Sequence, residues 1–178
     1  MGNNTNHPTN LILIGFMGTG KTTVGQRVAK SLGYAFVDTD ELIAQKAGMS
    51  IPEIFATHGE DYFRELETAA LDHCCQTRGQ VISTGGGIVV REPNRQLLKT
   101  GGYVIWLKAS ADVIYERIKR SKERPLVQTE DPLDTIKRML KERNSFYKES
   151  KDLSIVTDDL TVEETIYGVT ESARLALR

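Results

Sequence analysis

A glycine-rich segment near the start of the chain limits its possible folds more than any other feature. It reads Gly15-x-x-x-x-Gly20-Lys21-Thr22; an apolar run at 11–14 precedes it, and a helix-like stretch that stops at Gly33 follows it. Strand, glycine loop and helix in this order form a phosphate-binding loop, because glycines let backbone N–H groups turn inward and the helix start adds unpaired N–H groups. A plain glycine turn is the weaker alternative. We therefore predict a phosphate loop, with Lys21 supplying positive charge and the Thr22 hydroxyl able to ligate Mg²⁺.

The rest of the chain predicts an α/β protein. Its 178 residues suit one domain with a full core. Strand-like and helix-like stretches alternate, which predicts a five-stranded parallel sheet with helices on both faces. We expect strands at 11–14, 35–37, 80–83, 103–107 and 154–156, and helices at about 24–32, 41–47, 52–58, 60–78, 94–99, 111–119, 133–147 and 162–175. Ligands should gather at the carboxyl ends of the strands.

Composition excludes several classes of partner. With 23 basic and 24 acidic residues the formal net charge is -1, which predicts neither nucleic acid nor a membrane as partner. No apolar run approaches the length of a membrane span. The adjacent Cys74 and Cys75 match no disulfide framework and fit a reducing compartment. Residues 1–10 are polar and we expect them to be a disordered leader, followed by one domain at 11–178.

One segment interrupts the alternation. Residues 121–132 contain Pro125 and Pro132, several charges and no periodicity. A solvated linker is one interpretation. The other is a mobile lid that closes over the site and excludes water, and its place in a phosphate-loop protein favours the lid.

Two acidic residues follow the second strand. Asp38 and Asp40 are two residues apart, so their carboxylates lie on one side of an extended chain. Beside a phosphate loop, one could serve the metal and the other an acceptor hydroxyl. Either could instead cap the helix that follows, and Asp40 could do both.

Two arginines also have reasons to face the site. Arg64 stands at helical spacing from Glu60 and Glu67, which could give a ladder of ion pairs on the surface. The alternative is that Arg64 points toward the site, because Glu67 lies in an apolar stripe and a carboxylate there needs Arg64 as its partner. Arg143 falls on the apolar arc of its helix, while Arg138 and Lys141 point away. An inward arginine without an acid on its own helix face suggests a bound anion, and a distant acid is the alternative.

A run of three glycines, Gly85 to Gly87, follows the third strand. It allows a ligand to approach the backbone closely, although three glycines alone are also common in turns. They do not form the G-x-G-x-x-G of a dinucleotide site.

Together these features resemble the shikimate kinase family, in order and spacing, over residues 11 to about 150. The matching stretches are 15–25, 36–40, 50–55, 59–60, 63–64, Glu67, 83–87, 124–126, 142–143 and Tyr147. The resemblance implies a P-loop kinase fold with a mobile lid, and transfer of the ATP γ-phosphoryl group to the 3-hydroxyl of shikimate on the route to aromatic amino acids. It also implies a monomer, and the lack of a transit peptide favours the bacterial cytoplasm.

The resemblance implies roles for individual residues. Lys21, Asp40 and Arg124 would be catalytic, with Asp40 the base and Arg124 a lid arginine that reaches ATP. ATP would lie on Gly18, Thr19, Gly20, Lys21, Thr22, Thr23, Arg117 and Arg124, with Arg117 stacked on adenine. Shikimate would lie on Asp40, Phe55, Phe63, Arg64, Gly85, Gly86, Gly87 and Arg143, with the two arginines on its carboxylate. Mg²⁺ would be held by Thr22 directly and by Asp38 through water.

The chain departs from the family pattern in two places. The lid has Val127 where a second Leu is usual, and the family's second adenine contact has no match near Asp158 and Asp159. Two other functions remain possible from the sequence: a kinase for gluconate or a nucleoside monophosphate, and a nucleotide sensor without activity. The Gly-Gly-Gly and Asp-Thr-Asp segments argue against the first, and the presence of Lys21, Asp40 and Arg124 argues against the second.

Overall fold

A computed structural model of the chain describes residues 10–119 and 129–177. Within them the predicted parallel sheet is confirmed, with strand order β2-β3-β1-β4-β5 and parallel pairing throughout. The strands are β1 (Leu11–Ile14), β2 (Ala35–Asp38), β3 (Gln80–Ser83), β4 (Tyr103–Lys108) and β5 (Leu153–Val156). All carboxyl ends therefore meet at one edge, where the phosphate loop follows β1.

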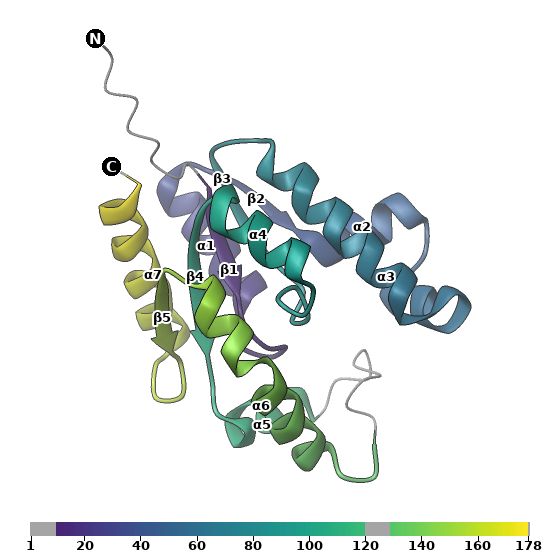
Figure 1. Cartoon of the computed structure of the whole chain (residues 1–178). Helices are drawn as coiled ribbons and strands as arrows, with labels where there is room; N and C mark the ends of the chain where they lie inside the picture. Colours follow the sequence, from purple (N-terminus) through teal and green to yellow (C-terminus); the bar gives the residue numbers. More distant parts are fainter. Residues whose placement is uncertain (1–9, 120–128, 178) are drawn as a thin grey trace.

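Helices cover both faces of the sheet (Figure 1). They are α1 (Lys21–Leu32), α2 (Thr39–Ala47), α3 (Ile51–Cys75), α4 (Glu92–Gly101), α5 (Ala111–Ile118), α6 (Pro132–Ser150) and α7 (Val162–Ala176). Side chains of α1 and α7 pack on one face, and side chains of α3, α4 and α6 pack on the other. The side chains of β1 contribute to both clusters, because successive side chains of a strand point to opposite faces of the sheet.

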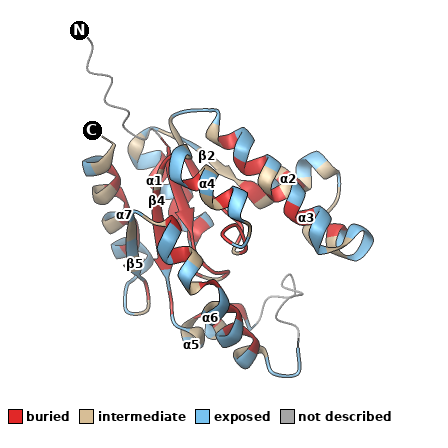
Figure 2. Cartoon of the chain, in the orientation of Figure 1, coloured by how far each residue is buried: buried red, intermediate tan, exposed pale blue. Residues whose placement is uncertain are grey.

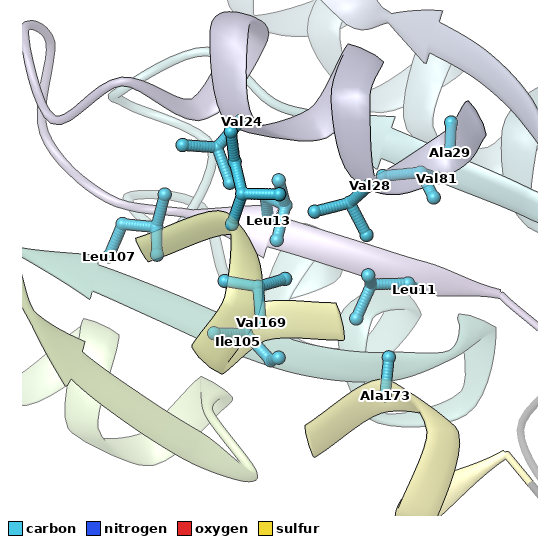
Figure 3. Packing of buried hydrophobic residues seen from close by; sticks show 11 residues of the cluster. Leu11, Leu13, Val24, Val28, Ala29, Val81, Ile105, Leu107, Val169 and Ala173 are labelled. Atoms are coloured by element: carbon cyan, nitrogen blue, oxygen red, sulfur yellow. The ribbon is translucent and has the colours of Figure 1, made fainter. Parts of the chain in front are cut away.

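The core is built on the central strands. Leu11 and Leu13 lie with Val28 of α1 and Val169 of α7 in one cluster (Figure 3). The alternate residues of β1 join the cluster on the other face. Figure 2 shows the buried residues concentrated along these strands while the outer helix surfaces are exposed. Because β1 is buried on both faces, it reads as a continuous apolar run in the sequence.

Sequence signals for helix ends are borne out at several places. The capping box of Ser50 with Glu53 is present, and Gly33 ends α1 in the left-handed conformation with φ 70°. The break predicted near Gly59 appears as a non-helical residue, with φ 82°, inside α3. That helix ends at Cys75, not at the predicted Arg78.

Asn10 explains the early end of α3 and corrects the predicted leader. Its side chain donates to the Thr77 carbonyl (2.6 Å) and accepts from the Gln80 N–H (3.1 Å), and the residue is 1% exposed. The segment after Cys75 is therefore held to the start of β1 and cannot continue as a helix. Asn10 belongs to the folded part of the chain, whereas the other leader residues, 1–9, lie outside the described residues.

The predicted lid is described only at its end. Pro132, its last residue, is instead the first residue of α6, where the ring fits because that position needs no N–H donor. Residues 121–128, including Arg124, lie outside the described residues. Among the helices that the structure does describe, none is both long enough and apolar enough to cross a bilayer.

Candidate active site

The phosphate loop forms a cradle at the carboxyl end of β1. Gly18 and Gly20 adopt positive φ angles of 76° and 89°, and Gly20 stands at the start of α1 without a side-chain cap. The Lys21 ammonium donates to the carbonyls of Gly15 (2.8 Å) and Phe16 (2.9 Å), so it folds back over its own loop. This geometry leaves the helix start open toward an anion and keeps a positive charge beside it.

An oxygen-rich corner lies beside this cradle. Thr22 Oγ1 donates to Asp38 Oδ2 (2.8 Å) and lies 3.4 Å from Ser83 Oγ. Asp38 Oδ1 accepts from the Asp40 N–H (3.0 Å), so Asp38 is the residue that caps α2. No group of three or more Asp, Glu, His or Cys side chains in the described residues could hold a metal alone. A hydroxyl and one carboxylate nevertheless suit Mg²⁺, which takes its remaining oxygens from phosphates and water.

Asp40 and the phosphate loop share one cavity. It measures about 290 Å³. Its lining consists of Met17, Gly18, Gly20, Lys21, Thr22, Thr23, Asp38, Asp40, Thr84, Gly86 and Arg117. Asp38 and Asp40 therefore both lie beside the phosphate loop, as predicted, but not on one extended chain: Asp38 ends β2 and Asp40 lies in the first turn of α2.

Arg64 makes both kinds of ion pair that its spacing allowed. It donates to the buried Glu67 Oε2 (3.0 Å) and to Glu60 Oε1 (2.9 Å), whose side chain is 57% exposed. Glu67 itself is 0% exposed. Burial raises the pKa of Glu67 to about 7, although Arg64 lowers it; Asp40 adds to the increase.

The three glycines are the junction of the site. A Cβ atom on Gly85 would lie 2.8 Å from Asp40 Oδ1 and 2.9 Å from Glu67 Oε1. One on Gly86 would lie 3.0 Å from the backbone nitrogen of Met17, in the phosphate loop. One on Gly87 would overlap the Arg64 guanidinium. Close approach from three directions therefore explains why all three positions lack a side chain.

Arg143 reaches the same junction from α6. It is 9% exposed, Nη1 donates to the Gly86 carbonyl (3.2 Å), and its guanidinium carbon lies 5.6 Å from the centre of the Phe16 ring. Within the described residues no carboxylate lies within 4.0 Å of it. Its predicted inward orientation is confirmed; it forms no ion pair with a described acid, although its charge acts to lower the pKa of Glu67.

Tyr147 is a site residue for which sequence reasoning assigned no role. Its hydroxyl donates to the Gly86 carbonyl (2.5 Å), and its ring stacks on Trp106 with centroids 5.3 Å apart. It is completely buried, and burial raises its pKa well above the usual range, so the hydroxyl remains a donor. An inward tyrosine on the arc of Arg143 was the available signal, since a buried hydroxyl requires a partner.

Arg117 connects the phosphate loop to the residue that follows the edge strand β5. It donates to the carbonyls of Gly18 (3.3 Å) and Thr157 (3.0 Å). Asp158 follows Thr157, and its Oδ1 accepts from the Ser110 N–H at the start of α5 (2.8 Å). The structure thus gives Asp158 a supporting role, and the predicted stacking of Arg117 on adenine stays a prediction.

The two predicted phenylalanines lie together beside Arg64. The ring centroids of Phe55 and Phe63 are 4.7 Å apart, and Phe63 is 4% exposed in a cluster with Ile43 and Ile54. Neither ring lines the cavity of about 290 Å³ at the phosphate loop. Their contact with substrate therefore stays a prediction.

These contacts define a class of protein. A phosphate loop with its lysine, an acidic side chain and two inward arginines meet at the carboxyl edge of a parallel sheet. That is the arrangement of a P-loop kinase acting on a small anionic acceptor.

Comparison with known proteins gives the family: the chain belongs to the shikimate kinases, whose family model matches residues 17–174. The shikimate kinase of Caldanaerobacter subterraneus subsp. tengcongensis is 48% identical over 155 residues, or 87% of this chain and 90% of that one. The structure of the Acinetobacter baumannii shikimate kinase in complex with shikimate superposes with a TM-score of 0.90 at 36% identity, covering 95% and 94% of the two chains.

The same comparisons bear on the rival acceptor. A gluconokinase from Sinorhizobium meliloti 1021 is only 18% identical, with a TM-score of 0.59. This likeness shows a common fold and does not indicate gluconate as the acceptor of this chain. As a member of the shikimate kinase family, the chain uses ATP to phosphorylate shikimate in the route to aromatic amino acids.

Proposed function

We propose that this site transfers the γ-phosphoryl group of ATP to the 3-hydroxyl of shikimate at the junction formed by Gly85 to Gly87. The observation that supports this most directly is the convergence of Asp40, Arg64 and Arg143 on those glycines, next to the phosphate loop. An acid for the hydroxyl and two cations for the carboxylate are the groups that a hydroxy acid acceptor needs.

Arg64 and Arg143 bind the shikimate carboxylate in this proposal. A guanidinium presents a planar fork of donors that matches a carboxylate, and both side chains are almost fully buried. They approach from α3 and α6, so a carboxylate between them would be held from two sides. Phe55 and Phe63 would support the acceptor ring.

Asp40 serves as the base in this proposal. Its carboxylate lines the cavity that contains the phosphate loop, and it faces Gly85. The acceptor hydroxyl would donate its proton to Asp40 as it attacks phosphorus, so that a neutral alcohol becomes a competent nucleophile without leaving the site.

ATP lies along the phosphate loop in this proposal. The backbone of Gly18 to Thr23 and the Lys21 ammonium would hold its phosphates, with Arg124 adding charge from the lid and Arg117 contacting adenine. Thr22 would ligate Mg²⁺, with Asp38 bound through water. When bound, Mg²⁺ supplies charge neutralisation on the phosphate oxygens.

Three broader features are also proposed. Residues 10–178 form one kinase domain whose lid begins at about 121 and ends before Pro132, and the protein works as a monomer. The free thiols of Cys74 and Cys75 suit a reducing compartment, so we place the protein in the cytoplasm.

A coupled assay for ADP release tests the acceptor. Shikimate should support turnover with ATP, whereas gluconate and a nucleoside monophosphate should not. Mass spectrometry of the product, or loss of turnover with a 3-deoxy analogue, tests the position of phosphorylation. Equal turnover with the 3-deoxy analogue would contradict attack by the 3-hydroxyl.

A further inference from the structure

Glu67 is a buried carboxylate that is only half satisfied. Oε2 accepts from Arg64 Nη1 (3.0 Å), but Oε1 is buried and has no hydrogen-bond partner among the described residues. A buried acceptor without a partner is costly while the group is charged. Oε1 faces Gly85, on the side where Asp40 Oδ1 also lies.

The charges around Glu67 come from three helices. Arg64 stands beside it on α3, Asp40 faces it from α2, and Arg143 and Tyr147 approach from α6. Burial raises its pKa to about 7, where a small change in surroundings alters its protonation. Glu60 contacts the other side of Arg64, but its side chain is 57% exposed to solvent.

The arrival of shikimate changes this balance. Before binding, two buried arginines face two carboxylates, those of Asp40 and Glu67. If the shikimate carboxylate binds at Arg64 and Arg143, as in the proposed function, a third negative charge enters the same enclosed region. Protonation of Glu67 would restore equal numbers of positive and negative charges, and it would remove the cost of burying a charged oxygen that has no partner.

We propose that shikimate binding drives protonation of Glu67, so that the binary complex takes up a proton from solvent. Glu67 is then a positioning residue. Once neutral, it no longer competes with the shikimate carboxylate for the Arg64 guanidinium, and it no longer repels the Asp40 carboxylate. The proton comes from water or buffer and is bound at Oε1. This inference rests on the proposed position of the shikimate carboxylate.

Calorimetry tests the coupling without turnover. Shikimate alone is titrated into the protein at pH 7.5 in buffers of different ionisation enthalpy. The slope of the observed binding enthalpy against the ionisation enthalpy of the buffer gives the number of protons exchanged. We expect wild type to take up on the order of half a proton per shikimate, and its affinity to weaken about fivefold between pH 7 and pH 9.

Two isosteric variants assign the proton. Glu67→Gln removes the titrating group, so proton uptake and the pH dependence of affinity should both disappear. Glu60→Gln removes the exposed carboxylate on the same arginine, and proton uptake should persist. Infrared difference spectra of wild type should show a new protonated carboxyl band on shikimate binding, and they decide the matter if Glu67→Gln fails to fold or bind.

The outcomes are separable. Tight shikimate binding with no proton uptake by wild type, or uptake that persists in Glu67→Gln, would overturn the coupling and leave the proposed function intact. Absence of shikimate binding to wild type would overturn both. Loss of proton uptake in Glu60→Gln would show that Glu60, and not Glu67, takes up the proton, and it would also overturn the inference.

Discussion

Removing Arg143 should separate shikimate binding from ATP binding. Its hydrogen bond in the structure goes to the Gly86 carbonyl (3.2 Å), which Tyr147 also contacts (2.5 Å), so the glycine keeps a donor in Arg143→Ala. In the proposed function the lost interaction is a charge-assisted hydrogen bond to the shikimate carboxylate, worth roughly 1.5–3 kcal/mol, or about 10- to 150-fold in affinity. The shikimate dissociation constant should rise by that factor.

Arg64→Ala should have a similar effect on affinity but a larger effect on stability. The structure shows Arg64 bonded to Glu67, which is 0% exposed, so the substitution leaves a buried carboxylate without its partner. Loss of one member of a buried pair costs about 3–5 kcal/mol, and less if the remaining carboxyl takes up a proton. Thermal unfolding of the two variants should therefore separate them even where their affinities agree.

Calorimetric titrations of shikimate and of a non-hydrolysable ATP analogue, each done separately, check the pair of arginines. The double variant should lose less affinity than the sum of the single losses, because both arginines act on one carboxylate in the proposed function. Arg143→Lys should not restore binding, since an ammonium lacks the planar fork. Lys141→Ala, an exposed cation on the same helix, is the matched control. Equal losses for ATP and shikimate, or full additivity, would refute a shared carboxylate.

Three further changes test other parts of the site. Asp40→Asn keeps the shape but removes the proposed base, so turnover should fall on the order of 10²-fold or more while ATP affinity is retained; near-normal turnover would contradict the assignment. Tyr147→Phe removes a donor to Gly86 and should lower stability by about 1 kcal/mol, measured by urea unfolding; an unchanged midpoint would contradict that contact. Burial raises the Glu67 pKa to about 7, so the folded state binds the extra proton below that pH and loses stability as pH rises from about 4.5 to 7. This loss is on the order of 3 kcal/mol, and Glu67→Gln should remove it from a plot of unfolding free energy against pH. An identical slope in wild type and variant would show that a group other than Glu67 titrates.

Local patterns were sufficient for the parts of the site whose residues are close together in the sequence. The phosphate loop follows from a strand, a glycine spacing and a helix start that are contiguous in sequence. The Arg64 pair with Glu67 follows from helical spacing plus an apolar stripe. In each case the interacting groups are close in sequence, so periodicity and spacing carry the information.

Contacts between distant elements could not be predicted in this way. The hydroxyl of Tyr147 meets Gly86 across a separation of 61 residues, and Arg117 meets Thr157 across 40. No local sequence pattern indicates either contact, because the order of the strands and the packing of the helices bring these residues together. The end of α3 has the same origin, since the side chain of Asn10 holds the backbone at Thr77 and Gln80.

The two arginines differ in a way that bears on substrate choice. The charge of Arg64 is already matched by Glu67 and Glu60, whereas no described carboxylate lies within 4.0 Å of Arg143. An acceptor with a carboxylate would supply the missing partner, while a neutral polyol of the same size would enclose Arg143 without one. Because a buried cation without a counter-ion penalises the wrong ligand more than an extra contact rewards the right one, we expect discrimination for an acid to rest chiefly on Arg143.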